Sequence, residues 1–218
     1  MSEAANPGAI ARQIVFIVDD DPSICEGLAN LLESIGIPTQ SHQSAEAFRD
    51  SWNREHRGCL LLDARLPGMS GVAFQDQMRA TDIDLPIIFM TAHGDIPMVR
   101  KVMKAGAVEF LTKPFQKEEL LQAVQEAFAL DREKREEELG LRRIRSRIDS
   151  LSPREREVMA MVTAGMLNKQ IAAELNLSEI MVKIHRRGVM EKMQADSLAE
   201  LVKFCEKAQE PASRGRRN

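Results

Sequence analysis

Four short apolar runs, separated by segments of helical periodicity, constrain the fold of this chain more than any other feature. The runs are IVFIV (14–18), CLLLD (59–63), PIIFM (86–90) and AVEFL (107–111). Their length and their branched residues are typical of strands buried on both faces, as in a parallel sheet. A more polar run, 37–41, is expected to be an edge strand. Because parallel strands need crossover connections, the alternation predicts a doubly wound, five-stranded α/β domain.

The segment after the first run carries the signals of a helix. Asp21 can cap its start, Pro22 suits its first turn, and Gly36 can end it. Its apolar residues recur on one face: Ile24, Leu28, Leu31, Leu32 and Ile35. Further helices are predicted to begin near Ser44, Gly71 and Ile96.

After Pro114 no proline follows until Pro153 and the only glycine is Gly140, and from residue 151 onward the pattern is purely helical. A helix that begins near Gln116 can therefore continue beyond the first domain. The wholly charged run 131–138 favours a solvated tether, whereas the apolar residues at helical spacing after it leave a short coiled-coil seam as the alternative. The predicted parts are a disordered N-terminus at 1–13, the α/β domain at 14–130, a helical linker at 131–150, an all-α domain at 151–208 and a disordered tail at 209–218.

Composition restricts the environment of the chain. Residues 1–130 carry 11 Lys and Arg against 18 Asp and Glu, whereas residues 151–218 carry 12 against 9, so the basic part suits a polyanion. The three cysteines are odd in number and widely spaced, which argues against disulfides and a zinc site and indicates inert thiols. No run approaches the ~20 apolar residues of a membrane span, and we expect a cytoplasmic protein without membrane contact.

Polar side chains stand where the predicted strands end. Asp19 and Asp20 follow the first strand, Asp63 ends another, Thr91 ends the next, and Lys113 follows the last. Ligands of such sheets bind beyond the carboxyl ends of the strands, so these groups are expected at one rim. Close carboxylates repel one another, and Mg²⁺ is the usual hard cation that holds them ionised. A carboxylate beside an ammonium and a hydroxyl can also attack a phosphoryl group, which indicates phosphoryl transfer onto Asp63.

Four motifs, IVFIVDDD, LLLDARLPGMSG, IIFMTAHGD and FLTKPF, occur in this order, with 43 residues from Asp20 to Asp63 and 22 from Thr91 to Lys113. Through them residues 14–116 resemble the receiver domain of two-component response regulators. The resemblance implies that a sensor histidine kinase phosphorylates Asp63. By position it implies that Mg²⁺ is bound by Asp19, Asp20, Asp63 and the Arg65 carbonyl. It also implies that Thr91 is the switch hydroxyl, Phe110 the switch aromatic residue and Lys113 the phosphate partner.

One of these residues departs from the family pattern, and two motifs also have simpler interpretations. Phe110 stands where many receivers have Tyr, so the switch would lack that hydroxyl. The Lys113–Pro114 pair could be only a turn, although the resemblance implies a cis bond there. His93, in a Gly-Asp loop, could be a metal or base site, but we favour a solvated surface residue.

Residues 168–192 have the pattern of a helix, a tight turn and a second helix. Asn176 can adopt the left-handed conformation in the turn, and Ser178 can cap the second helix. Val182 and Val189 are predicted to face inward. The outward residues form a cationic stripe of a kind that can enter a DNA major groove, with an ordinary solvated face as the alternative: Lys183, Ile184, Arg186 and Arg187.

Segments LSPREREVM, NKQIAAEL, SEIMVKIHRR and SLAELV make residues 152–205 similar to the C-terminal helix-turn-helix domain of the NarL/LuxR/FixJ family. The HGDIPM stretch and the long linker point to its FixJ-like members. The resemblance implies base or groove contacts by Lys183, Ile184 and Arg187, and DNA-backbone contacts by Asn168, Lys169, Arg186 and Lys192. Ile180 and Met181 stand where relatives often carry Lys and Thr, so we expect altered site preference or weaker affinity. His185 is expected to be partly buried.

Together these patterns predict a DNA-binding response regulator that dimerises when Asp63 is phosphorylated. Its expected partners are a sensor histidine kinase, double-stranded promoter DNA, a second copy and RNA polymerase. We expect no enzymatic activity beyond slow loss of its own phosphate. One alternative is an Mg²⁺-dependent phosphatase with Asp63 as nucleophile, but Arg65 stands where such enzymes carry an acid. A second alternative is a module that dimerises without DNA.

Overall fold

The computed structural model describes residues 12–81, 83–92 and 96–209, without the side chain of Arg79. The chain divides into two compact units, one ending at Lys134 and the other beginning at Arg135. The expected disordered ends lie outside the described residues, apart from residues 12, 13 and 209, and so does His93. Within these ranges, no helix is both long enough and apolar enough to pass through a membrane.

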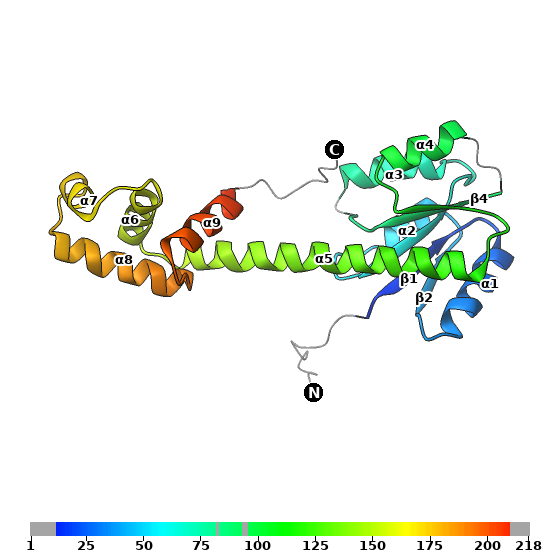
Figure 1. The fold of residues 1–218 in the computed structure, drawn as a ribbon. Helices are drawn as coiled ribbons and strands as arrows, with labels where there is room; N and C mark the ends of the chain where they lie inside the picture. The colour runs from blue at the N-terminus through cyan, green and yellow to red at the C-terminus, as the bar shows by residue number, and fades with distance from the viewer. Residues whose placement is uncertain (1–11, 82, 93–95, 210–218) are drawn as a thin grey trace. The chain divides into compact units, whose positions relative to one another are not determined.

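The first unit is built on five parallel strands in the order β2-β1-β3-β4-β5 (Figure 1). Each strand begins within two residues of its predicted start, and the polar run forms the edge strand β2. The doubly wound α/β prediction is therefore confirmed. The strands are β1 (Ile14–Val18), β2 (Thr39–His42), β3 (Gly58–Asp63), β4 (Ile87–Thr91) and β5 (Glu109–Thr112).

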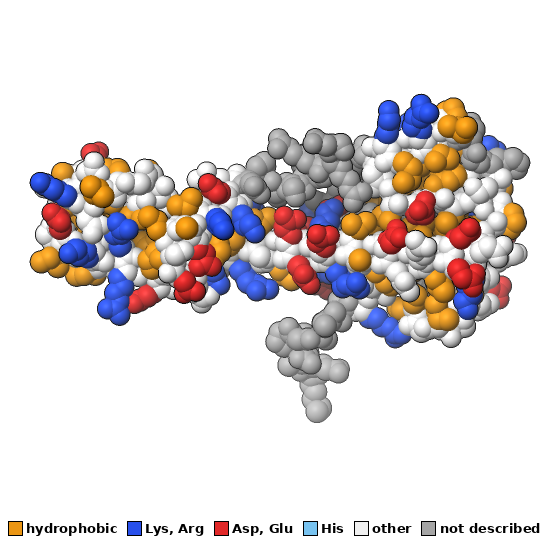
Figure 2. Space-filling model, viewed as in Figure 1, with side chains coloured by type: hydrophobic (Ala, Val, Ile, Leu, Met, Phe, Trp, Pro, Cys, Tyr) orange, Lys and Arg blue, Asp and Glu red, His pale blue; other side chains and the backbone are white. Residues whose placement is uncertain are grey.

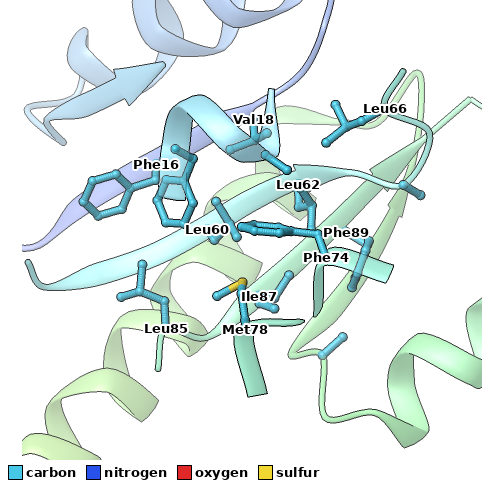
Figure 3. Close-up of a cluster of buried hydrophobic side chains, with 14 of the residues drawn as sticks. Phe16, Val18, Leu60, Leu62, Leu66, Phe74, Met78, Leu85, Ile87 and Phe89 are labelled. Carbon is cyan, nitrogen blue, oxygen red and sulfur yellow. The ribbon is translucent and has the colours of Figure 1, made fainter. Parts of the chain in front are cut away.

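Helices cover both faces of this sheet because side chains alternate along each buried strand. Leu28 of α1 and Val124 of α5 pack with Ile17 on one face. The other face packs against α2, α3 and α4, and Figure 3 shows its cluster around Phe16, Phe74 and Phe89. The five helices are α1 (Pro22–Glu33), α2 (Ala45–Ser51), α3 (Gly71–Ala80), α4 (Ile96–Lys104) and α5 (Lys117–Asp149).

Local signals set the limits of α1 as the sequence predicts. The Asp21 carboxylate accepts a hydrogen bond from the Ser23 amide at 2.9 Å, and Pro22 occupies the first turn. Gly36 adopts a φ of +83°, a conformation that is open to glycine and ends the helical path.

Helix α5 is continuous over 33 residues, through the charged run and through Gly140. The charged run is not wholly solvated, because Asp131 is buried and its carboxylate accepts a hydrogen bond from the Gly58 amide at 3.1 Å. Of the apolar residues after the run, Ile148 and Leu151 pack with the core of the second unit. Ile144 is buried in the same core.

The second unit is all-helical, as predicted. The end of α5 is followed by α6 (Pro153–Thr163), α7 (Asn168–Glu174), α8 (Glu179–Met193) and α9 (Leu198–Gln209). Its core contains residues from all of these helices, among them Val158, Ile171, Val182 and Leu201. The capping box at the start of α6 is present: the Glu155 amide donates to Ser152 Oγ, and the Ser152 amide donates to the Glu155 carboxylate.

Candidate functional site

The carboxyl ends of β1 and β3 bring together the acidic residues predicted from separate motifs. Asp19 directly follows β1, and Asp63 is the last residue of β3. These strands are neighbours in the sheet, and the strand order reverses between them. Ligands of such sheets bind at this point of reversal. Carboxylate oxygens of Asp19, Asp20 and Asp63 lie within 4.8 Å of one another. Asp19 and Asp63 are buried, whereas Asp20 is exposed.

Lys113 joins the two buried carboxylates. Its Nζ donates to Asp19 Oδ2 at 2.5 Å and to Asp63 Oδ2 at 2.7 Å. Its backbone amide donates to the Thr91 carbonyl at 2.7 Å, and the bond to Pro114 is cis. The ammonium group is thereby held at the ends of both central strands.

Backbone amides fix the second oxygen of each buried carboxylate. The Asp21 amide donates to Asp19 Oδ1 at 3.0 Å, and the Arg65 amide donates to Asp63 Oδ1 at 2.7 Å. Thr91 is buried at the end of β4, beside β3. The orientation of the Asp63 carboxylate is therefore set by one amide and one ammonium group before any ligand binds.

The charges in this pocket are unequal. Burial raises the pKa of Asp19, and the hydrogen bond from Lys113 opposes this effect. Burial alone would lower the pKa of Lys113, but the hydrogen bonds and charges of Asp19 and Asp63 more than offset it, so that pKa is raised and the ammonium stays charged. The three neighbouring carboxylates form a hard-oxygen donor set whose negative charge exceeds that of the one ammonium group, and such a set fits Mg²⁺.

Phe110 lies on the strand next to Thr91. It pairs in register with Phe89 between β4 and β5, and it packs, half-buried, against the apolar cluster beneath α2, α3 and α4. Thr91 pairs with Thr112 two positions further along the same strands. The two residues proposed for the switch therefore lie on adjoining strands.

A helix-turn-helix is present in the second unit, with the local geometry that the sequence predicts. Asn176 has a φ of +52° in the turn between α7 and α8. Ser178 Oγ accepts a hydrogen bond from the Met181 amide at 3.2 Å and caps α8. Val182 and Val189 are buried against the core.

The predicted DNA contacts differ in whether they bind another helix of the protein. Lys169, Lys183, Ile184 and Arg187 are exposed, and Figure 2 shows hydrophobic and basic side chains close together over the beginning of α8. Arg187 Nε donates to Glu191 Oε1 at 2.7 Å, one turn further along the same helix. These residues form a surface from which a ligand can be contacted directly.

The remaining predicted contacts join α8 to other helices of the unit. Arg186 Nη1 donates to Asn168 Oδ1 at 2.7 Å and links α8 to the start of α7. Lys192 Nζ donates to Glu155 Oε2 at 2.7 Å and links α8 to α6. Glu155 and Lys192 lie 37 positions apart, so the sequence pattern gave no signal for this contact. His185 is half-buried, as expected.

Two family models together match most of the chain. The model "Response regulator receiver domain" matches residues 15–125, and the model "Bacterial regulatory proteins, luxR family" matches residues 149–205. Both resemblances stated from the motifs are thus confirmed.

Curated relatives and a solved structure share both parts. Nodulation protein W of Bradyrhizobium diazoefficiens is 47% identical over 198 residues, which cover 91% of this chain and 87% of the relative. FixJ of the same organism is 38% identical over 194 residues, which cover 89% and 95%. The structure of the response regulator StyR is 45% identical, covers 90% of this chain and 100% of its own, and has a TM-score of 0.81. The chain therefore belongs to the two-component response regulators, in which a receiver domain is joined to a DNA-binding helix-turn-helix domain of the luxR family.

Proposed function

We propose that Asp63 accepts a phosphoryl group from a sensor histidine kinase and that this modification makes the chain bind promoter DNA as a dimer. One observation carries the proposal: Lys113 bridges Asp19 and Asp63 within the acidic pocket. An ammonium group in this position neutralises charge beside the carboxylate that would react.

The transfer needs one nucleophile and neutralisation of the phosphoryl oxygens. An Asp63 oxygen attacks the phosphorus of a phosphohistidine, the P–O bond forms as the P–N bond breaks, and the departing imidazole takes a proton from water. Lys113 and Thr91 then face the phosphoryl oxygens. The carboxylates of Asp19, Asp20 and Asp63 and the Arg65 carbonyl would hold Mg²⁺, which supplies Lewis-acid neutralisation of the phosphoryl charge when bound.

The phosphoryl group would act by shifting an existing equilibrium of the receiver. It adds roughly −1.5 to −2 charges, which the Lys113 ammonium and the Thr91 hydroxyl attract. As Thr91 moves toward the phosphoryl group, the half-buried Phe110 ring turns into the vacated space. The face built by α4, β5 and the start of α5 then becomes the dimer surface, and the exposed Ile96 and Met103 of α4 support this choice.

Dimerisation would present two copies of α8 to half-sites about one DNA turn apart. The exposed Lys183 and Arg187 would meet phosphates or guanine edges. RNA polymerase is the further partner expected at a promoter, and the cytoplasm is the expected location.

Phosphorylation can be tested on the full-length chain with acetyl phosphate and Mg²⁺, followed by intact-mass measurement. We expect one added phosphoryl group in the wild type, and none in Asp63→Asn or in the presence of a Mg²⁺ chelator. Asp76→Asn is the matched control, since Asp76 is an exposed aspartate on α3. Equal phosphorylation of Asp63→Asn would contradict the proposed acceptor.

A further inference from the structure

The C-terminal end of α8 is held by an arginine of α5. Arg147 Nη1 donates a hydrogen bond to the Met193 carbonyl at 3.1 Å, and Arg147 Nη2 donates one to Gln194 Oε1. The guanidinium also lies over the ring of Phe204 on α9, with Cζ 5.9 Å from the ring centroid. One side chain therefore joins α5 to α8 and α9, and Figure 1 shows these three helices meeting at the end of α5.

This contact uses properties that arginine has and lysine lacks. The last carbonyls of a helix have no partner within it, and the helix dipole gives this end a partial negative charge, so a cation is favourable there. Met193 is the last residue of α8, and Gln194 ends the helix in the left-handed conformation, with a φ of +51°. A planar guanidinium can donate to both residues at once while its face rests on an aromatic ring, whereas an ammonium group is a point charge.

The place of Arg147 on α5 makes it a firm anchor for α8. Ile144 is buried in the core of the second unit, and Ile148 packs against that core, so the backbone on both sides of Arg147 is held in place. The apolar contacts of α8 with the same core, such as those of Val182 and Val189, have no directional preference. Hydrogen bonds do have one. The Arg147 contacts therefore resist sliding and tilting of α8 that apolar packing alone would tolerate.

The length of α8 magnifies any displacement at its end. The helix has 15 residues and is about 22 Å long. A tilt of about 5° at its C-terminal end would move its N-terminal end by about 2 Å. Hydrogen bonds to base edges form only within about 0.5 Å of donor–acceptor distance, so this movement would break them. The attraction of basic side chains to phosphates extends over about 8–10 Å and would persist.

We propose that Arg147 is a positioning residue: by fixing the C-terminal end of α8, it sets where the N-terminal half of that helix meets base edges. The inference rests on the proposed DNA-binding function. It concerns a residue outside the segments that carry the two resemblances, which end at residue 116 and begin again at residue 152. Arg147 itself does not touch DNA, so its loss is expected to weaken binding to a specific sequence and to leave attraction to the DNA backbone unchanged.

The test uses the full-length chain, treated with acetyl phosphate and Mg²⁺, and two duplexes. One is selected by the wild type from a random pool, and the other has the same composition in scrambled order. Arg147→Lys keeps the charge but cannot form the paired contact. Gln194→Asn keeps an amide and a residue that tolerates the left-handed conformation, but its side chain is one methylene group shorter.

We expect Arg147→Lys to bind the selected duplex about tenfold more weakly and the scrambled duplex within about twofold of the wild type. Gln194→Asn should show a smaller loss in the same sense. Because both changes remove one contact, the double variant should lose no more than Arg147→Lys alone. Arg143→Lys is the matched control, since Arg143 is an exposed arginine one turn earlier on α5, and it should bind both duplexes as the wild type does.

The binding-competent fraction of each variant is measured by titration at high duplex concentration. Gln194 is exposed, so Gln194→Asn tests the same contact if Arg147→Lys does not fold. An equal loss of affinity for both duplexes, or no loss in either variant, would overturn the inference and leave the proposed function intact. A salt slope lowered by about one in Arg147→Met would also overturn it, because Arg147 would then contact a phosphate directly. Absence of sequence-specific binding by the wild type would overturn both proposals.

Discussion

The carboxylate of Glu155 occupies the space in which any residue larger than glycine at position 188 would place its Cβ. A Cβ added to Gly188 would lie 2.6 Å from Glu155 Oε1. The same carboxylate accepts hydrogen bonds from the Ser152 amide and from Lys192 Nζ, each at 2.7 Å. Gly188 thus permits one carboxylate to cap α6 and to join it to α8.

We predict that Gly188→Ala destabilises the second unit although alanine favours helix. The added methyl group displaces the Glu155 carboxylate and weakens both the cap and the bond to Lys192. Loss of a helix cap costs about 0.5–2 kcal/mol and the weakened bond to Lys192 adds to this cost, whereas the gain in helix propensity is about 1 kcal/mol. Urea unfolding followed by the helical circular dichroism signal measures the balance.

Gly140→Ala is the control for helix propensity alone. Gly140 lies inside α5, and nothing lies within 4 Å of the position where its Cβ would be. The substitution should stabilise α5 by about 0.5–1 kcal/mol. A Gly188→Ala variant as stable as Gly140→Ala would show that the Glu155 contact does not contribute to the free energy of unfolding.

The pH dependence of the second unit should reflect Glu155. The hydrogen bond from Lys192 holds the pKa of Glu155 below its ordinary value of 4.5. A carboxyl group with a lowered folded-state pKa contributes stability that is complete above the unfolded value and is lost as pH falls through the folded value. The urea concentration at the unfolding midpoint should therefore decrease as the pH is lowered below about 4.5. In the Glu155→Gln variant this decrease should be less steep. Identical slopes in the two proteins would refute this role.

Asp131 is predicted to stabilise the receiver from inside a charged segment. Its carboxylate accepts hydrogen bonds from the Gly58 amide at 3.1 Å and from Gln13 Nε2 at 3.3 Å. Asp131→Ala leaves the buried Gly58 amide without this acceptor, and a loss of about 1–3 kcal/mol in unfolding free energy is expected. Urea unfolding followed by Trp52 fluorescence reports on the first unit alone, because Trp52 is the single tryptophan of the chain.

Glu133→Ala provides the comparison, since Glu133 is exposed two residues further along α5. Its effect should stay within about 0.5 kcal/mol. Equal stability losses in the two variants would mean that the charge of the segment matters and the buried hydrogen bonds do not.

Asp131 also illustrates what the sequence could not predict. It is one of eight consecutive charged residues, 131–138, and its partner Gly58 lies 73 positions away. Periodicity identifies the face of a helix but not which charged side chain meets a distant backbone amide. The same limit applies to Lys192 and Arg186, which were predicted as DNA contacts and bind Glu155 and Asn168 in the structure.

The acidic pocket could be predicted because its geometry follows from topology. Parallel strands end at one edge of their sheet, so Asp19 and Asp63 had to approach each other once β1 and β3 were neighbours. The turn between α7 and α8 was predictable for a local reason. Asn176 and Ser178 act within a few residues of their own positions.

The thiols should react slowly with alkylating reagents at neutral pH. Burial raises the pKa of Cys25 and of Cys59. Burial also raises the pKa of the half-buried Cys205, and the negative charge of Glu206 raises it further. The thiolate is the reactive form, so labelling of the folded protein should begin at Cys205. Peptide mapping after timed alkylation gives the order, and early labelling of Cys59 would contradict the burial described.

One measurement tests most directly whether Asp63 controls DNA binding. It is the affinity of the full-length chain for a DNA duplex that the chain selects from a random pool, with and without acetyl phosphate and Mg²⁺. Coupling between two sites commonly amounts to about 5–150-fold. The account predicts tightening within that range for the wild type and none for Asp63→Asn. Equal affinity of the wild type in both conditions, with its phosphorylation verified by mass, would contradict it.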